Sequence, residues 1–231
     1  MKRHLFSVLF GVLITSMSYS QFNENPVLNL ENFDKQRVHW GYFLGFNQYD
    51  FKFDYNENTG DVLVAKTTGF NVGLIGNLRL NEYFDLRFEP GLYYTQRDLG
   101  FPNFTDESDF LREVRSTYIH FPLLIKASTK RLGNFKPYIV GGVSTSINLG
   151  SNEDSRDDNS NGTFRMKRST YYYEIGFGID LYLFYFKFSP SIRGVFAFNN
   201  ELVPDADPNS PWTSNINGMY SRALFINFTF E

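Results

Sequence analysis

FYFKFSPSIRGVFAF, residues Phe184–Phe198, alternates between two kinds of side chain. The even-numbered positions are mainly Phe, Pro and Ile, whereas the odd-numbered positions include Lys187, Arg193 and two serines. A period of two residues is typical of a β-strand whose two faces meet different environments. At about 15 residues, the segment exceeds the usual soluble strand of about 5–6 residues and could cross a bilayer at a tilt. A recurrence of this pattern would indicate a transmembrane barrel.

The alternation recurs along the chain, most clearly at the C-terminus, where apolar and polar positions again take turns. The eight candidate strands cover residues 40–55, 70–80, 84–95, 118–126, 136–149, 171–183, 184–198 and 220–231. An open edge would leave unpaired backbone groups in hydrocarbon, so such a sheet must close. We therefore predict an all-β fold, an eight-stranded antiparallel up-and-down transmembrane β-barrel.

The faces that are expected to point inward carry charges of both signs. They contain Arg79, Asp85, Arg87, Glu89, His120, Lys126, Glu174, Asp180, Lys187 and Arg193. Eight strands enclose a space that side chains can fill without an open pore. A buried charge without a partner costs several kcal/mol, so we predict that this set forms ion pairs and gives the barrel a filled polar interior.

The two ends of the chain differ in character. Lys2 and Arg3 precede an apolar run that ends at small residues, so residues 1–20 are predicted to be a signal peptide, cleaved to leave Gln21. Residues 21–38 are strand-poor and are read as a periplasmic arm before the barrel, residues 39–231.

No later run is apolar enough for a spanning helix. The mean hydropathy of −0.33 does not argue against a barrel, because alternation hides its apolar face.

Connections alternate in length. Short turns are expected near residues 81–83, 130–135 and 183–184, and long loops over residues 56–68, 98–113, 150–168 and 199–219. In outer-membrane barrels the periplasmic turns are short and the extracellular loops long. We therefore expect a cell outer-membrane location with both ends of the mature chain in the periplasm. Rims of aromatic side chains are also expected, with Trp40, Tyr42, Phe135 and Tyr138 at one end and Tyr93, Tyr94, Tyr171 and Tyr173 at the other.

Several chemical functions are disfavoured. The formal charge of −3 has no basic cluster, which argues against nucleic acid, and the absence of cysteine excludes thiolate sites. The Asp-rich segment 151–162 lacks calcium-loop spacing and is read as a solvated flexible loop, so no metal is predicted. His39 and His120 have no obvious partner for lipid hydrolysis. No catalytic residue, cofactor or small-molecule substrate is inferred.

Two irregularities are expected within the strands. Pro90, Pro122 and Pro190 lie in predicted strands, where proline removes a ladder donor. Each site is expected either to bulge, which is the favoured alternative, or to mark a functional distortion. In the first strand the apolar face changes parity around Asn47–Tyr49, which a further bulge would repair.

Two segments resemble a known family. NLENFDKQRVHWGYFLGF, residues Asn29–Phe46, and YIHFPLLIK, residues Tyr118–Lys126, are similar to the PorT family of outer-membrane β-barrels in Bacteroidota. Members commonly show Tyr, Pro-Leu and Lys in the second segment, as Tyr118, Pro122, Leu123 and Lys126 do, with an acid where His120 stands. The resemblance implies a component of the type IX secretion system, which also serves gliding motility.

The expected function is therefore a non-enzymatic, accessory or structural component of type IX secretion. The alternatives are a generic small outer-membrane barrel, serving structure, adhesion or narrow conduction, and a lipid-modifying enzyme. The expected partners are outer-membrane lipid and other secretion components. The apolar residues Val27, Leu28, Leu30 and Phe33 of the arm could dock on a partner or enter the lumen.

Overall fold

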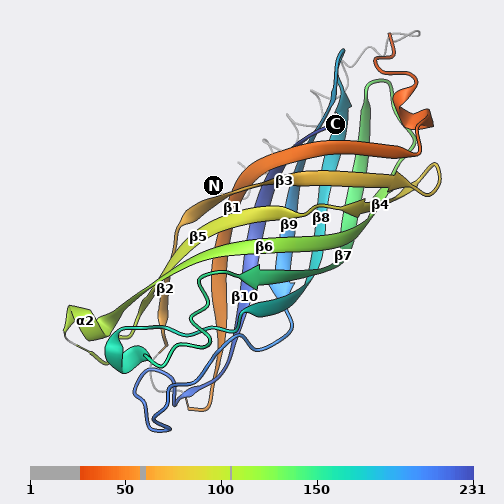
Figure 1. Ribbon diagram of the computed structural model, residues 1–231. Coiled ribbons are helices and arrows are strands. Elements are labelled where there is room, and N and C mark those ends of the chain that lie inside the picture. Colours follow the sequence, from red (N-terminus) through yellow and green to blue (C-terminus); the bar gives the residue numbers. More distant parts are fainter. Residues whose placement is uncertain (1–26, 58–60, 105) are drawn as a thin grey trace, which may run out of the picture.

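The computed structural model describes residues 27–57, 61–104 and 106–231, and the expected signal peptide lies outside these ranges. The described chain is almost entirely antiparallel strand (Figure 1). The strands are β1 (Val38–Tyr55), β2 (Leu63–Lys66), β3 (Thr68–Arg79), β4 (Phe84–Phe88), β5 (Gly91–Gly100), β6 (Leu111–Ser128), β7 (Phe135–Asn148), β8 (Ser169–Tyr182), β9 (Lys187–Ala197) and β10 (Ile216–Phe230). The short helices are η2 (Phe33–Lys35), α2 (Glu107–Phe110) and η3 (Asn159–Asn161).

The ladder of strands closes on itself. β1 pairs with β10 on one side and with β3 on the other, and Phe46 lies opposite both Ile226 and Phe70. β4 and β5 pair with β6 in a single register, while β2 and β3 both pair with β5. The ten segments therefore act as eight strands, two of them interrupted. The predicted eight-stranded antiparallel fold is confirmed.

The expected bulges at the three prolines are wrong. Pro122 lies in an unbroken register between β6 and β7, and Pro190 in one between β9 and β10. Between β4 and β5, the carbonyl oxygen of Pro90 accepts a bond of 2.9 Å from the backbone N–H of Leu74. Proline lacks a donor but keeps its acceptor, so each site loses a hydrogen bond without gaining a residue.

The expected parity change in β1 is also wrong. The pairing of β1 with β10 runs without a shift from Tyr42 to Asp54, and the irregularity lies between Asp54 and Tyr55. Large aromatic side chains, Phe43, Tyr49 and Phe51, occupy inward positions of β1 and are buried. In the sequence, an inward aromatic residue cannot be told from an outward one. The alternation therefore suggests a change of the apolar face that the strand does not make.

The segment Phe184–Phe198 divides into a turn and a strand. β9 begins at Lys187, and the backbone N–H of Leu183 donates to the carbonyl oxygen of Phe186 at 3.0 Å. Phe184 and Tyr185 are among the most exposed side chains of the chain. The strand portion keeps the predicted alternation, with Lys187 and Arg193 buried.

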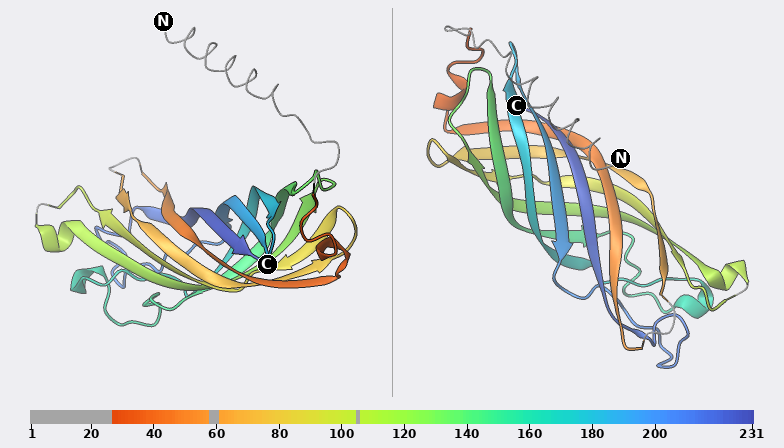
Figure 2. Two further views of the ribbon diagram at one scale, coloured as in Figure 1. Left: turned by 90° about the horizontal axis from the view of Figure 1, so that it is seen from above. Right: turned by 180° about the vertical axis from the view of Figure 1, so that it is seen from behind.

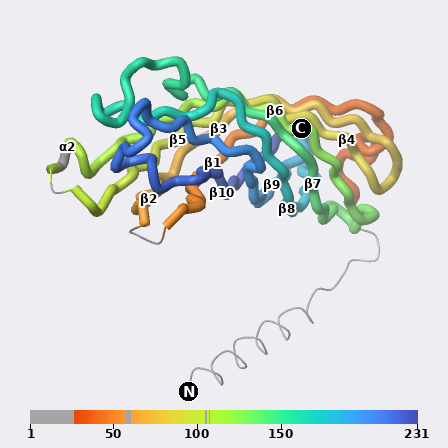
Figure 3. The backbone as a smooth tube through the Cα atoms, turned by 90° about the horizontal axis from the view of Figure 1, so that it is seen from below, coloured from red at the N-terminus to blue at the C-terminus, as the bar shows by residue number. Residues whose placement is uncertain are grey.

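Short and long connections lie at opposite ends, as expected. We call the end with the arm and the short turns the arm end, and the end with α2 and the long connections the loop end (Figures 1 and 3). The strands run obliquely between the two (Figure 2). β2 and the first residues of β6 lie in segments that were expected to be loops. No helix among the described residues has the length and apolarity needed to span a membrane.

Candidate functional site in the lumen

Seven interior side chains form one continuous chain near the arm end, made of ion pairs and one histidine–carboxylate hydrogen bond. In order they are His120, Glu174, Arg193, Glu89, Arg87, Glu231 and Lys187. Consecutive members are joined by N···O distances of 2.7 to 3.0 Å, and no member's side chain is more than 7% exposed. We call this set the ion-pair chain. It connects β4, β6, β8, β9 and the end of β10 across the lumen.

A separate pair lies in the same part of the lumen. Lys126 contacts Asp180 at 2.6 Å, and the Ser189 hydroxyl donates to the same carboxylate at 2.7 Å. The Lys126 ammonium lies 4.0 Å from the ring centre of Tyr138. Asp85 is buried directly across the β4–β6 ladder from Lys126.

Charge balance explains how these groups tolerate burial. Among the paired groups, four carboxylates, Glu89, Glu174, Asp180 and Glu231, face four cations, Arg87, Lys126, Lys187 and Arg193. Buried Asp85 and Lys136 add one charge of each sign. An isolated buried ion would cost several kcal/mol, and pairing with additional hydrogen bonds offsets that cost. Removal of any shared partner therefore leaves an uncompensated charge.

Arg79 departs from the inward set proposed from the sequence. It is the last residue of β3, is only partly buried, and donates from Nε to the carbonyl oxygen of Asn81 at 3.2 Å. Its parity points inward, but it lies where the ladder ends, so its side chain turns to the adjacent turn. The other nine proposed residues are all buried in the lumen.

Several buried charges, among them Glu231 and Arg97, are absent from the inward set proposed from the sequence. Glu231 accepts from both Arg87 and Lys187, and Arg97 is fully buried. For both residues, the alternation of the sequence indicates an inward position. Arg97 shares the odd parity of Asp85, Arg87 and Glu89 on one continuous strand, and Glu231 continues the polar face of β10.

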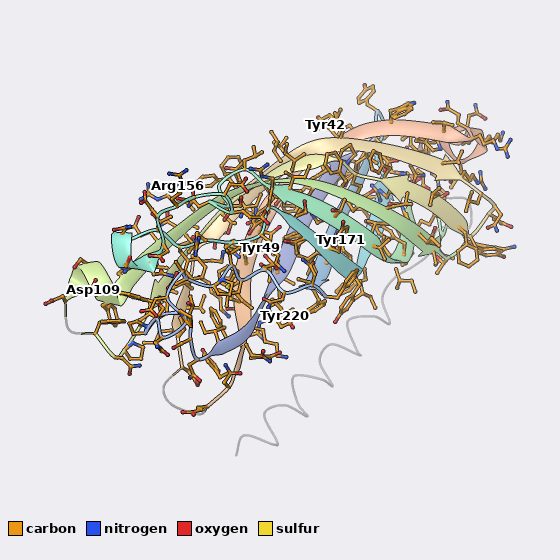
Figure 4. All side chains as sticks on the ribbon, turned by 60° about the horizontal axis from the view of Figure 1, so that its bottom comes forward. Tyr42, Tyr49, Asp109, Arg156, Tyr171 and Tyr220 are labelled. Atoms are coloured by element: carbon orange, nitrogen blue, oxygen red, sulfur yellow. The ribbon has the colours of Figure 1, made fainter. Side chains whose placement is uncertain are left out.

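An aromatic layer lies above the ion-pair chain, toward the loop end. Tyr49 stacks on Tyr118 with ring centres 5.2 Å apart, and Tyr93 approaches Phe225 at 4.8 Å. Figure 4 shows Tyr49 directed into the lumen and Tyr42, on the same strand, directed outward. These rings occupy the space that an axial channel would need.

Arg97 marks the loop-end side of the aromatic layer. Its guanidinium lies 3.9 Å from the ring centre of Phe51 and donates to the Tyr118 hydroxyl at 2.7 Å and the Ser221 hydroxyl at 3.3 Å. Ser221 in turn donates to the buried carboxylate of Glu201 at 3.0 Å. Arg97, on β5, thus contacts side chains of three other strands, β1, β6 and β10.

The long connections fold into an ordered cap, so the expectation of a solvated flexible loop is wrong for part of residues 151–162. Asn159 is buried and donates to Asp205 at 3.0 Å, while Arg112 donates to the Asn159 carbonyl oxygen at 2.8 Å. The Ser160 hydroxyl and the Ala206 backbone N–H donate to Asp158, which lowers the pKa of its carboxyl group.

An apolar cluster supports the cap. It comprises Phe51, Leu99, Phe101, Val114, Phe164, Met166, Leu202, Ile216 and Met219. Trp212 stacks on Phe104 with centres 4.8 Å apart and donates from Nε1 to the carbonyl oxygen of Asp109 at 3.0 Å. The acidic composition of these loops concealed the apolar residues that pack beneath them.

Within the described part of the chain, the two histidines, His39 and His120, are both engaged inside the protein. His120 is fully buried, and its Nε2 lies 2.7 Å from Glu174, another member of the inward set that was expected to form pairs. His39 is buried and stacks on Phe33 with ring centres 4.1 Å apart. Neither ring faces the outer wall, so neither can meet a lipid substrate there.

The arm packs across the arm-end mouth of the lumen. Phe33 lies over the ammonium of Lys187 at 4.6 Å, and the Tyr182 hydroxyl donates to Asp34 at 2.8 Å. Arg131 donates to the carbonyl oxygens of Asn29 and Leu30. Phe33 therefore packs against the barrel itself, whereas Val27 and Leu28 remain exposed.

The aromatic rims differ from expectation at two positions. Trp40, Tyr42, Phe135, Tyr94, Tyr171 and Tyr173 are exposed on the outer wall. Tyr138 and Tyr93 are buried in the lumen, because their parity on β7 and β5 points inward.

Within the described ranges, no three His, Asp or Glu side chains converge as a metal site would require.

A closed antiparallel ladder with an apolar outer wall and an ion-paired lumen defines a membrane β-barrel. The chain belongs to the outer membrane protein beta-barrel domain family, which matches residues 19–203. This membership supports a location in the outer membrane. A search of curated proteins found no match.

Solved outer-membrane proteins resemble the fold at low identity. OprG from Pseudomonas aeruginosa is 13% identical, with 84% of this chain and 95% of that chain covered and a TM-score of 0.47. Neisserial surface protein A is 10% identical, with 84% and 98% covered and a TM-score of 0.46. Ail of Yersinia pestis is 12% identical, with 84% and 99% covered and a TM-score of 0.41. These likenesses carry no argument about function.

Proposed function

We propose that this protein is a closed, non-enzymatic barrel of the outer membrane that acts as a structural or docking element and does not pass solutes. The ion-pair chain carries the proposal, because it fills the lumen with paired charges that an open pore would leave hydrated. The aromatic layer and the cap close the same axis at two further levels. Recording in planar bilayers tests this, and no stable conductance is expected.

The orientation of the barrel is part of the proposal. Short turns are periplasmic and long connections extracellular in this class of barrel. The arm and the end of β10 would then lie in the periplasm, and the cap with Asn159 and Trp212 would face the outside. The working surfaces are therefore the cap and the exposed part of the arm, with Val27 and Leu28.

A finer proposal is that this barrel serves type IX secretion as an accessory component. Its support is the resemblance of Asn29–Phe46 and Tyr118–Lys126 to the PorT family. The first of these segments joins the arm to β1, where an exposed periplasmic surface would be available to other components. The second supplies His120 and Lys126 to the lumen.

Two measurements test the finer proposal. Deletion of the gene should abolish export of proteins that bear the type IX C-terminal signal, and a mild-detergent pull-down from native membranes should recover large components of that system. Complementation with the intact gene is the control and should restore export. Normal export in the deletion strain, together with recovery of a lone barrel, would overturn the type IX assignment and leave the generic barrel standing.

A further inference from the structure

A groove runs across the outer wall of the barrel, perpendicular to the strands. It follows a row of residues that lie directly opposite one another on five neighbouring strands: Ile125, Gly141, Ile175, Gly194 and Leu224. The groove has a volume of about 610 Å³ and includes Ala127 and Ile139 of the next row toward the arm end. Gly141 indents the wall along this row, whereas the Phe196 ring lies against Gly194, where an added Cβ atom would meet it at 3.1 Å.

Gly141 accounts for the depth of the groove. A Cβ atom at this position would meet only the carbonyl oxygen of Glu174, at 3.5 Å, which is an ordinary contact. The absent side chain therefore leaves open space on the outer wall and avoids no clash. Ile139, Ile175 and Phe177 are all well exposed at its edges, so the groove opens to the hydrocarbon around the barrel.

The groove ends at a cluster of charges. At Gly194 and Leu224 it meets a second hollow of about 310 Å³ that is also lined by Asp50, Lys66 and Arg222. The Asp50 carboxylate contacts Arg222 at 2.7 Å and Lys66 at 2.8 Å. Two cations share one acid, so the cluster carries one net positive charge. The side chains of Arg222 and Lys66 are 52% and 41% exposed, which leaves both able to bind a further anion.

The cluster lies at the loop-end border of the apolar belt. The outward side chains of β1 are Trp40, Tyr42, Leu44 and Phe46, and from Gln48 onward they are polar. Arg222 is paired directly with Asp50 and is followed on the outer wall of β10 by Leu224 and Ile226. In a membrane this border coincides with the level of the lipid headgroups, where basic side chains meet phosphate.

We infer that the groove and the cluster form a binding site for one lipid with a net-negative phosphate headgroup. An acyl chain lies in the groove over Gly141, and the phosphate accepts hydrogen bonds from Arg222 and Lys66. The site is independent of the proposed closed function, because it lies on the outer wall and uses none of the lumen residues. It requires only that the barrel span the membrane.

Native mass spectrometry of the full barrel tests this site. The protein is released from micelles that contain phosphatidylglycerol or phosphatidylcholine of equal chain length. The intact protein should retain one phosphatidylglycerol in preference to phosphatidylcholine. Arg222→Gln should reduce retention of phosphatidylglycerol by about fivefold, as expected for one basic residue near an anionic lipid surface. Gly141→Leu should fill the groove and reduce retention of both lipids.

Two matched variants separate the site from general effects. Lys52→Gln removes an exposed cation on the same outer border, where Lys52 pairs with Asp54, and should leave retention unchanged. Val143→Leu adds bulk at the next outward position of β7, beyond the groove, and should also leave it unchanged. An unchanged unfolding midpoint in each variant shows that the fold is kept.

Three results would overturn the inference. Equal losses in Arg222→Gln and Lys52→Gln would mean that only general surface charge matters. Full competition by inorganic phosphate would mean that the cluster binds a free anion without an acyl chain. A mass of two chains without lipid would mean that a second copy covers the groove.

Discussion

Glu89→Gln is expected to lower the free energy of unfolding by about 3–5 kcal/mol, the usual cost of breaking a buried ion pair from one side. Glu89 contacts Arg87 at 2.7 Å and Arg193 at 2.9 Å, and both guanidinium groups are almost completely buried. The amide keeps the shape of the side chain but removes its charge, so two cations lose a shared partner. Urea titration of the barrel in detergent micelles measures the change.

Glu113→Gln is the matched control. Glu113 also pairs with an arginine, Arg115 at 2.7 Å, but both side chains are about half exposed. Exposed ion pairs contribute about 0–1 kcal/mol to stability. The free energy of unfolding of this variant should therefore differ from that of the intact protein by no more than that amount. Equal effects of the two substitutions would contradict a dry, charge-balanced interior.

Gly142→Ala is expected to destabilise the barrel by about 1–3 kcal/mol, as overpacking does, or to prevent its assembly. Gly142 points inward on β7, where a Cβ atom would collide with the carbonyl oxygen of Leu123 and approach the Cα of Leu124 to 2.9 Å. Both atoms belong to the backbone of β6, so relief requires movement of a paired strand. The unfolding midpoint and the yield of refolded barrel measure the effect.

Gly141→Ala, one residue earlier, supplies the comparison. Its added methyl group would point to the outer wall with no contact closer than 3.5 Å. Replacement of glycine at a compatible position stabilises by about 0.4–1 kcal/mol, chiefly through the unfolded chain. If Gly141→Ala were the more damaging substitution, the assignment of inner and outer faces on β7 would be wrong.

The architecture was predictable because alternation survives in strands that separate lipid from a polar lumen. Lys187 and Arg193 on β9, and Glu174 and Asp180 on β8, share the inward parity that the sequence indicated. Their specific pairing was not predictable, since it depends on which residues lie opposite across the lumen. Glu174 meets His120 and Arg193, whereas Asp180 meets Lys126.

The other differences between prediction and structure have separate causes. Inward aromatic residues such as Tyr49 and Phe225 break the simple rule that polar side chains fill the lumen. The prolines cause no bulge, because the loss of a hydrogen-bond donor inserts no residue into the strand. The cap was missed because Asn159 and Asp205 lie 46 positions apart in sequence, and only the folded loops bring them together. Secretion, in turn, was inferred from resemblance and not from any side-chain chemistry.

Single-channel recording of the purified barrel in planar lipid bilayers tests the closed lumen most directly. The ion-pair chain, the aromatic layer and the cap predict that the intact protein gives no stable conductance step at any moderate voltage. A large-pore outer-membrane porin, prepared in the same detergent, verifies that insertion can be detected. Reproducible steps of uniform size from the intact protein, absent from mock preparations, would contradict a lumen filled by paired charges.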